Sequence, residues 1–134
     1  MDAVRELSAA GLTVGVSCSP VLPGITDSTE NLEAVVSAAA AAGARHIFAG
    51  ALFLKPCSSA VFLPFIDRNF PQLVENYRER YQDRAFLPPS YGRRIAQLVA
   101  SLRQKYGIHR ADPRGTMYAN KWPAQAFDEQ LGLF

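Results

Sequence analysis

Net charge and cysteine are both scarce in this sequence. Fourteen basic and twelve acidic side chains leave a net charge of +2 over 134 residues, too little to indicate a nucleic-acid or membrane partner from total charge alone. Cys18 and Cys57 are the only cysteines. Because they lie far apart in a chain without a secretion signal, they do not indicate a disulfide framework. Two buried structural thiols are the simpler interpretation.

Long apolar runs are also absent. No run reaches the length of a membrane span, and the first residues lack the apolar core of a signal peptide. Apolar residues nevertheless make up 49% of the sequence and charged residues 19%, which is the composition of a folded domain rather than a disordered chain. We therefore expect a cytoplasmic protein with no membrane partner.

The first 56 residues alternate helix and strand signals. Apolar spacing predicts a helix over residues 2–10 that ends at Gly11, followed by a strand over 12–18. A second helix is predicted after Asp27 and ends at Gly43, and an apolar run over 46–54 predicts a second strand. The two glycines are about 32 residues apart, which suits one βα unit of a parallel sheet.

The link between the first strand and the second helix carries turn residues. Pro20, Pro23 and Gly24 predict a loop from Pro20 to Asp27, because proline cannot supply the donor that a strand ladder needs. Asp27 and Glu30 have the spacing of a capping box at the start of the helix.

After Pro56 the pattern becomes helical. Ser58 or Ser59 could cap a helix that runs to Phe70. Apolar residues at helical spacing predict a second helix over residues 73–81 and a third from about Ser90 to Tyr106. The chain thus divides into an αβ part (1–56), a helical region (57–107) and an irregular tail (108–134). The tail contains an apolar hook formed by Trp122, Phe127, Leu131 and Phe134.

Two parallel strands do not make a complete sheet. Each is apolar enough to be buried on both faces, so a two-stranded sheet would leave open edges and uncovered faces. The pattern therefore predicts a part of a larger α/β fold.

One stretch resembles a known family. The order Gly-Leu-Thr-Val-Gly-Val-Ser-Cys-Ser-Pro-Val-Leu-Pro-Gly-Ile-Thr-Asp over residues 11–27, then a helix, Ala-Gly-Ala-Arg and an apolar strand, resembles the second half of radical S-adenosylmethionine (radical SAM) barrels. It is most similar to the proteins related to spore photoproduct lyase, and Asn-Phe-Pro-Gln-Leu-Val-Glu-Asn-Tyr-Arg-Glu-Arg-Tyr over 69–81 resembles their helical region. The resemblance covers roughly residues 2–107. It implies an α/β fold: the C-terminal portion of a (β/α) barrel with parallel strands, followed by a helical C-terminal extension.

The resemblance also implies cofactors. Members of this family bind a [4Fe–4S] cluster through a Cys-x-x-x-Cys-x-x-Cys motif, and S-adenosylmethionine binds the open iron. That motif is absent here, and Cys18 and Cys57 have the wrong spacing to replace it. We therefore expect neither cofactor to bind stably to this chain alone, with the cluster held by a missing N-terminal half of the barrel.

The implied activity is reductive cleavage of S-adenosylmethionine to a 5'-deoxyadenosyl radical, with nucleic acid as the suggested substrate class. The chain would be a fragment of such an enzyme and not competent alone. The alternative is a standalone, non-catalytic αβ binding module that uses its unpaired sheet edge or helical end.

Ligands of α/β barrels bind at the carboxyl ends of the strands. In the barrels that this chain resembles, the strand before such a Pro-Gly turn contacts S-adenosylmethionine. The resemblance therefore implies Ser19 and Pro20 as cofactor-binding residues, with Lys55 as a polar contact from the next strand. In the alternative interpretation, Ser17 and Ser19 only satisfy loop amides and Lys55 is a solvated strand end.

Other reactive side chains give weaker signals. Cys18 or Cys57 could donate a hydrogen atom to a substrate radical, although neither matches the family's cysteine by motif. His46 and His109 lack ligand-spaced partners, so no metal ligand or general base is assigned. Aromatic and basic residues alternate along the helical region and could bind nucleic acid, but a solvated face with ion pairs is the simpler interpretation; they are Tyr77, Arg78, Arg80, Tyr81, Arg84, Arg93 and Arg94.

Overall fold

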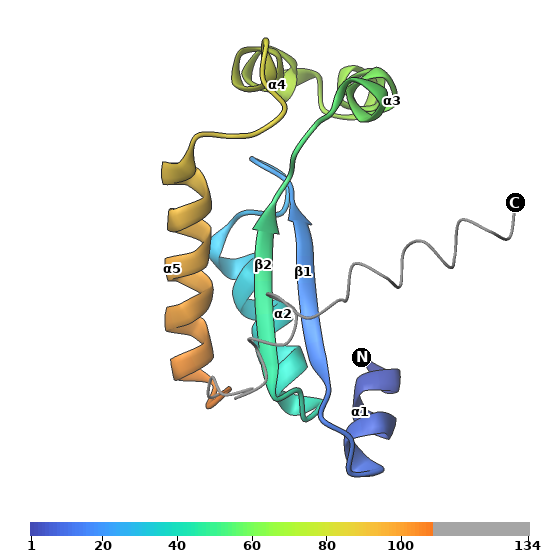
Figure 1. The fold of residues 1–134 in the computed structure, drawn as a ribbon, viewed down its shortest axis with the longest axis vertical. Helices are drawn as coiled ribbons and strands as arrows, with labels where there is room; N and C mark the ends of the chain where they lie inside the picture. The colour runs from blue at the N-terminus through green and yellow to red at the C-terminus, as the bar shows by residue number, and fades with distance from the viewer. Residues whose placement is uncertain (109–134) are drawn as a thin grey trace, which may run out of the picture.

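The computed structural model describes residues 1–108 (Figure 1). The predicted apolar hook (Trp122, Phe127, Leu131 and Phe134) lies outside these residues. The described elements are α1 (Asp2–Ala9), β1 (Gly15–Val21), α2 (Thr29–Ala41), β2 (His46–Ala51), α3 (Pro56–Asn69), the 3-10 turn η1 (Pro71–Leu73), α4 (Val74–Tyr81) and α5 (Pro89–Lys105).

The two strands lie side by side and run parallel, as predicted. Gly15 is aligned with His46, and the register continues to the pair Cys18 and Ala49. Helix α2 connects the carboxyl end of β1 to the amino end of β2 (Figure 1). The mixed α/β class is confirmed for the described residues.

Strand β1 continues through Pro20, so the prediction of a loop from that residue was wrong. The strand ends at Val21, and its register with β2 is irregular between Cys18 and Val21. A proline is tolerated there because it lies at an irregularity and on a strand with an open edge, where a missing donor breaks no ladder bond. Strand β2 is shorter than predicted and ends at Ala51.

The N-cap of helix α2 (Thr29–Ala41) is Ser28 rather than Asp27. The Ser28 side chain is the N-cap and accepts a hydrogen bond from the Asn31 amide (3.1 Å), so the predicted capping role of Asp27 was wrong. Helix α3 also begins earlier than expected. Lys55 is its N-cap residue without a side-chain cap bond, Pro56 occupies the first turn, and Ser59 Oγ donates to the Pro56 carbonyl (3.0 Å) instead of capping.

The buried side chains form two clusters. The first lies between one face of the sheet and helices α2 and α5, and includes Val21, Val36, Ile47, Ile95 and Val99. The second joins the segment after β2 to α3 and α4, and its buried members are Leu52, Leu54, Ile66, Tyr77 and Tyr81. Helices α3 and α4 thus lie beyond the carboxyl ends of the strands (Figure 1).

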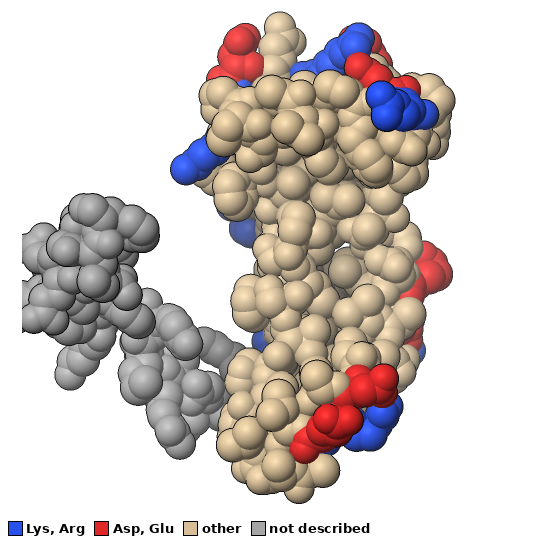
Figure 2. Space-filling model, turned by 90° about the vertical axis from the view of Figure 1, so that its right-hand side faces the viewer, with Lys and Arg blue, Asp and Glu red and all other residues tan. Residues whose placement is uncertain are grey.

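The other face of the sheet is uncovered by the described residues. Ser17 and Ser19 of β1 are exposed, and Phe48 of β2 is 59% exposed. Within the described residues, the two-stranded sheet thus has one uncovered face, as expected for two strands taken alone. Figure 2 looks toward the open edge of β1 and shows a surface nearly free of charged side chains, with Lys, Arg, Asp and Glu gathered at the two ends and along one margin.

Among residues 1–108, none of the helices has the length and apolar character needed to cross a membrane.

Candidate functional site

A groove opens where the strands end, beneath helix α3. Its volume is about 620 Å³, and no charged side chain is among its lining residues. They are Ser19, Pro20, Leu52, Phe53, Leu54, Ser58, Val61, Phe62 and Phe65. An apolar wall with a few hydroxyl groups is the usual character of a small-molecule site.

Two of the three predicted site residues lie in this groove. Ser19 and Pro20 line it, and both are exposed. Lys55 follows the carboxyl end of β2, at the same end of the parallel sheet, but its side chain is exposed and it is not among the lining residues. The structure thus brings Ser19 and Pro20 together and leaves Lys55 outside the groove.

On the uncovered face of the sheet, two glycines lie directly beneath side chains of the neighbouring strand. A Cβ atom on Gly50 would lie 2.8 Å from Ser19 Oγ, and one on Gly15 would lie 2.1 Å from the His46 ring. Glycine at these positions therefore lets Ser19 and His46 lie flat over the neighbouring strand. His46 is at the amino end of β2, away from the groove.

The two cysteines occupy different environments. Cys18 is half-buried against the first core cluster, on the helix-covered side of the sheet, and burial raises the pKa of its thiol. Cys57 is exposed in the first turn of α3. The interpretation as two buried thiols was therefore wrong for Cys57. Because Cys18 packs toward the helices, it is poorly placed to donate a hydrogen atom to a ligand on the uncovered face.

Within the described part of the chain, no three His, Cys, Asp or Glu side chains come together as a metal site. With two cysteines in the whole sequence, the residues present do not fit a [4Fe–4S] cluster, which the radical SAM proteins that the sequence resembles bind through three cysteines.

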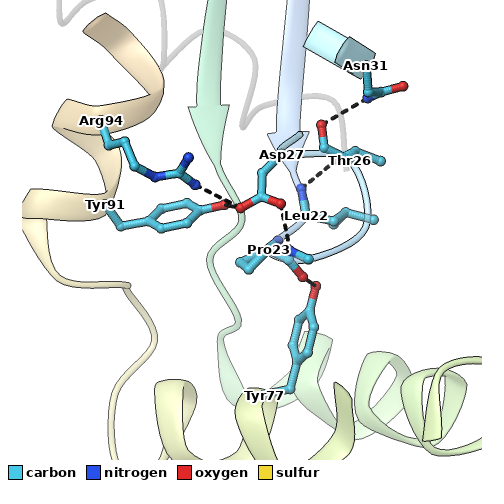
Figure 3. Close-up of polar contacts among 9 residues, drawn as sticks. Leu22, Pro23, Thr26, Asp27, Asn31, Tyr77, Tyr91 and Arg94 are labelled. Carbon is cyan, nitrogen blue, oxygen red and sulfur yellow. Dashed lines mark hydrogen bonds and ion pairs between the residues drawn. The ribbon is translucent and has the colours of Figure 1, made fainter. Parts of the chain in front are cut away.

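Asp27 holds the loop that follows β1 (Figure 3). One carboxylate oxygen accepts from the Gly24 amide (2.7 Å), and the other accepts from the Tyr91 hydroxyl (2.8 Å) and from Arg94 (2.9 Å). Tyr91 and Arg94 belong to α5, so one carboxylate ties the loop to a helix more than sixty residues later. We call this set, Gly24, Asp27, Tyr91 and Arg94, the loop clamp.

Two buried tyrosines hold the same region from α4. The hydroxyl of Tyr77 donates to the Pro23 carbonyl and that of Tyr81 to the Leu52 carbonyl, both at 2.9 Å. Their rings stack with centroids 5.9 Å apart. Since both residues are buried, the hypothesis that they stack on nucleic-acid bases was wrong.

Three of the five arginines in this set have partners within the described fold. Arg94 and Arg80 approach the Tyr91 ring at 5.1 and 5.7 Å from its centroid, as cation–π partners. Arg78 pairs with Asp67 at 3.4 Å. These contacts favour the interpretation as a helix face laced with ion pairs.

The buried tyrosines predict a loss of stability in alkali. Burial, with a smaller contribution from the Asp27 charge, raises the pKa of Tyr77 to about 12 from an ordinary value of 10.0. Burial also raises the pKa of Tyr81 and of Tyr91, the latter aided by the hydrogen bond to Asp27. Their contribution is fully present below pH 10 and should be lost as the pH rises toward 12, because the unfolded chain releases these protons first.

Tyrosinate absorbance and circular dichroism, recorded together along an alkaline titration, measure this effect. Ionisation of the buried tyrosines should coincide with unfolding, and Tyr77→Phe should make the loss of stability shallower. Full tyrosine ionisation near pH 10 with an intact fold would contradict the prediction.

Three comparisons bear on what the chain is related to. No family model matches it, and no solved structure does so significantly. It is 39% identical over 116 residues to proteins from two strains of Mycobacterium tuberculosis and from Mycobacterium bovis, each described as an uncharacterized protein. The match covers 84% of this chain and 34% of each relative. The chain therefore spans about a third of the length of the relatives it matches.

Proposed function

We propose that this chain forms the C-terminal half of a radical SAM barrel, most similar to the proteins related to spore photoproduct lyase. The observation that carries the proposal is the parallel pair β1 and β2, covered by helices on one face and lined on the other by glycine, serine and phenylalanine. A barrel buries helices outside and leaves its inner strand face for ligands near the carboxyl ends. The uncharged groove lies at that end.

The chain's own contribution to such an enzyme would be part of the barrel wall and part of the cofactor site. Ser19 offers a hydroxyl group and Pro20 an apolar surface inside the groove, beside Phe53 and Phe65. S-adenosylmethionine would contact this wall, whereas Lys55 could reach it only from outside the groove. Because this chain's residues do not fit the cluster, the cluster ligands must come from another part of the protein.

The length of the relatives supports this division. Two thirds of each relative lies outside the matched region, which is room enough for the cluster-binding half of a barrel. The competing function, a non-catalytic binding module, would use the same uncharged face for a protein partner. Nucleic acid as a substrate stays a suggestion of the resemblance, since two of the proposed stacking residues are buried.

The cofactor prediction can be tested on the purified chain. After anaerobic reconstitution with iron and sulfide, we expect a colourless protein without bound iron, because two thiolates, one half-buried and one exposed, cannot replace three converging ones. An absorbance spectrum and an iron count provide the measurement. About four irons per chain, with cleavage of S-adenosylmethionine under a reductant, would contradict the assignment of the ligands.

The enzymatic proposal needs a positive result as well. The reading frame upstream of this chain should encode Cys-x-x-x-Cys-x-x-Cys, and the protein that carries both parts should release 5'-deoxyadenosine from S-adenosylmethionine when reduced. A stop codon directly before Met1 would favour the binding-module alternative.

A further inference from the structure

We propose that a parallel β-strand from a part of the molecule outside this chain pairs with the free edge of β1, and that α1 is the helix leading from that strand into β1. The inference deepens the proposed function and rests on it in one respect, namely that the chain belongs to a larger parallel sheet. It does not depend on the cofactor.

The first argument is a structural repeat within the chain. Helix α1 ends with bonds from the Leu12 amide to the Leu7 carbonyl (3.1 Å) and from the Gly11 amide to the Ser8 carbonyl (3.0 Å). Helix α2 ends with the same two bonds, from Ala44 to Ala39 and from Gly43 to Ala40, both 2.9 Å. Gly11 and Gly43 share a left-handed backbone, with φ of 81° and 84°. Both helices therefore close with the same C-terminal motif and lead into a strand.

The repeat fixes where a preceding strand would lie. Helix α2 connects β1 to β2, its parallel neighbour. If α1 plays the same part for β1, the strand before α1 lies next to β1 on its free side and runs parallel to it. The ends of α1 and α2 are in contact, as expected for consecutive helices, because Ser8 Oγ donates to the Gly43 carbonyl (3.1 Å).

The second argument is the exposure of α1 to solvent. The helix has no buried residue within the described chain, and Leu7 is 45% exposed, although Val4 packs against the first core cluster. A further strand beside β1 would cover the apolar side of α1. That helix would then have the same relation to the sheet as α2.

The third argument is the edge of β1 itself. Between this edge and α2 lies a shallow hollow of about 250 Å³, whose lining includes Val16, Ser17, Leu32 and Val35. Free edge strands are usually protected by charged side chains, proline or bulges. In β1 the proline, Pro20, and the register irregularity lie only near the carboxyl end. Here no Lys, Arg, Asp or Glu occurs from Leu7 to Thr26, and the surface around the edge is uncharged (Figure 2). We expect an uncharged edge of this kind to pair with another strand.

A second copy of the chain is the less suitable occupant. In a two-fold symmetric dimer, two β1 edges would pair antiparallel, and that arrangement gives the α1 repeat no role. The relatives, of which the matched region is 34%, have the length to supply a preceding strand in parallel orientation.

Co-expression with a relative's remaining sequence tests the inference. The probe is the part of the Mycobacterium tuberculosis relative that this chain does not match, co-expressed with the tagged chain so that both fold together. We expect a one-to-one complex by light scattering, with slower hydrogen exchange at the β1 amides of Gly15–Val21 than in the chain alone.

Two lysine variants locate the contact. Ser17→Lys places a charge on β1 beside its free edge, where the added strand would pack, and should weaken the complex at least about tenfold. Ala38→Lys, on the exposed side of α2, should leave the affinity unchanged. Absence of a complex, equal effects of the two variants, or a complex without added protection of β1 would overturn the inference. A dimer of the chain that Ser17→Lys abolishes would overturn it in favour of a second copy.

The test separates this inference from the proposed function. A complex with protected β1 amides that binds no iron after reconstitution would leave the strand pairing intact and remove the radical SAM assignment. Iron binding in the complex supports both.

Discussion

Replacing Tyr77 with alanine should lower the free energy of unfolding by about 3–5 kcal/mol, the range for removing a buried aromatic ring. Among residues 1–108, Tyr77 is the largest fully buried side chain, at 0% exposure. Its ring packs 5.7 Å from that of Phe62 and 5.9 Å from that of Tyr81. Truncation would empty the centre of the second core cluster and leave the Pro23 carbonyl without its donor.

The measurement is urea unfolding, provided that the dependence of the unfolding free energy on urea concentration is the same in all variants. Tyr77→Phe should cost only about 1 kcal/mol, because it removes the hydroxyl and keeps the ring. Phe86→Ala is the matched control, since that ring is 62% exposed, and should cost less than about 1 kcal/mol. A cost for Tyr77→Ala no greater than that of the control would mean that α4 does not hold the loop after β1.

The sequence predicts the order and direction of the elements well, because periodicity and caps are local signals. The alternation of helix and strand and the glycine helix ends follow from residues within a few positions of each other, and the parallel pairing follows from the order strand, helix, strand. The exceptions have local causes too. Pro20 is a poor strand residue in general, and only its place at a register irregularity makes it tolerable.

Contacts between distant segments could not be predicted in the same way. Asp27 has the right type and position for a helix cap, yet its carboxylate binds Tyr91 and Arg94 in α5. The hydroxyl groups of Tyr77 and Tyr81 bind carbonyls 54 and 29 positions away in the sequence. In the sequence, the alternation of these tyrosines with arginines resembles a nucleic-acid-binding surface. In the structure both tyrosines are buried, so they are not available to stack on bases. The helical spacing of Leu73, Val74, Tyr77 and Tyr81 is the signal that could have indicated burial of the two tyrosines, because it places them on one apolar face.

Only part of the candidate site could be predicted, because the site also depends on contacts between distant segments. Strand ends in a parallel sheet share one edge, so Ser19 and Lys55 could be assigned to the same end of the sheet. Whether a side chain then enters the groove depends on helix α3, which begins directly after Lys55 and covers the groove with Val61, Phe62 and Phe65. Those three apolar residues were predicted only as parts of a helix.

Removing the carboxylate of the loop clamp is the second large effect we expect. Asp27→Ala deletes three hydrogen bonds to a charged group, and the Asp27 side chain is only 16% exposed. Bonds of this kind contribute about 1.5–3 kcal/mol each but are not additive within one network. We expect a loss of about 3 kcal/mol in the free energy of unfolding.

The comparison with Asp2 isolates the clamp from the general effect of losing a carboxylate. Asp2 pairs with Arg5, and its side chain is 87% exposed, so Asp2→Ala should change stability by no more than about 0.5 kcal/mol. Asp27→Asn should fall between the two, because an amide keeps one acceptor oxygen and loses the charge.

A second readout distinguishes loss of the clamp contacts from a general loss of stability. The hydrogen bond from Tyr91 to the Asp27 carboxylate is one cause of the raised pKa of that phenol, after burial. In Asp27→Asn the pKa of Tyr91 should therefore move back toward its ordinary value, whereas Asp2→Ala should leave it in place. If Asp27→Asn lowered stability but left the Tyr91 titration unchanged, the carboxylate would be acting on the loop through Gly24 alone, and α5 would have no part in holding the loop after β1.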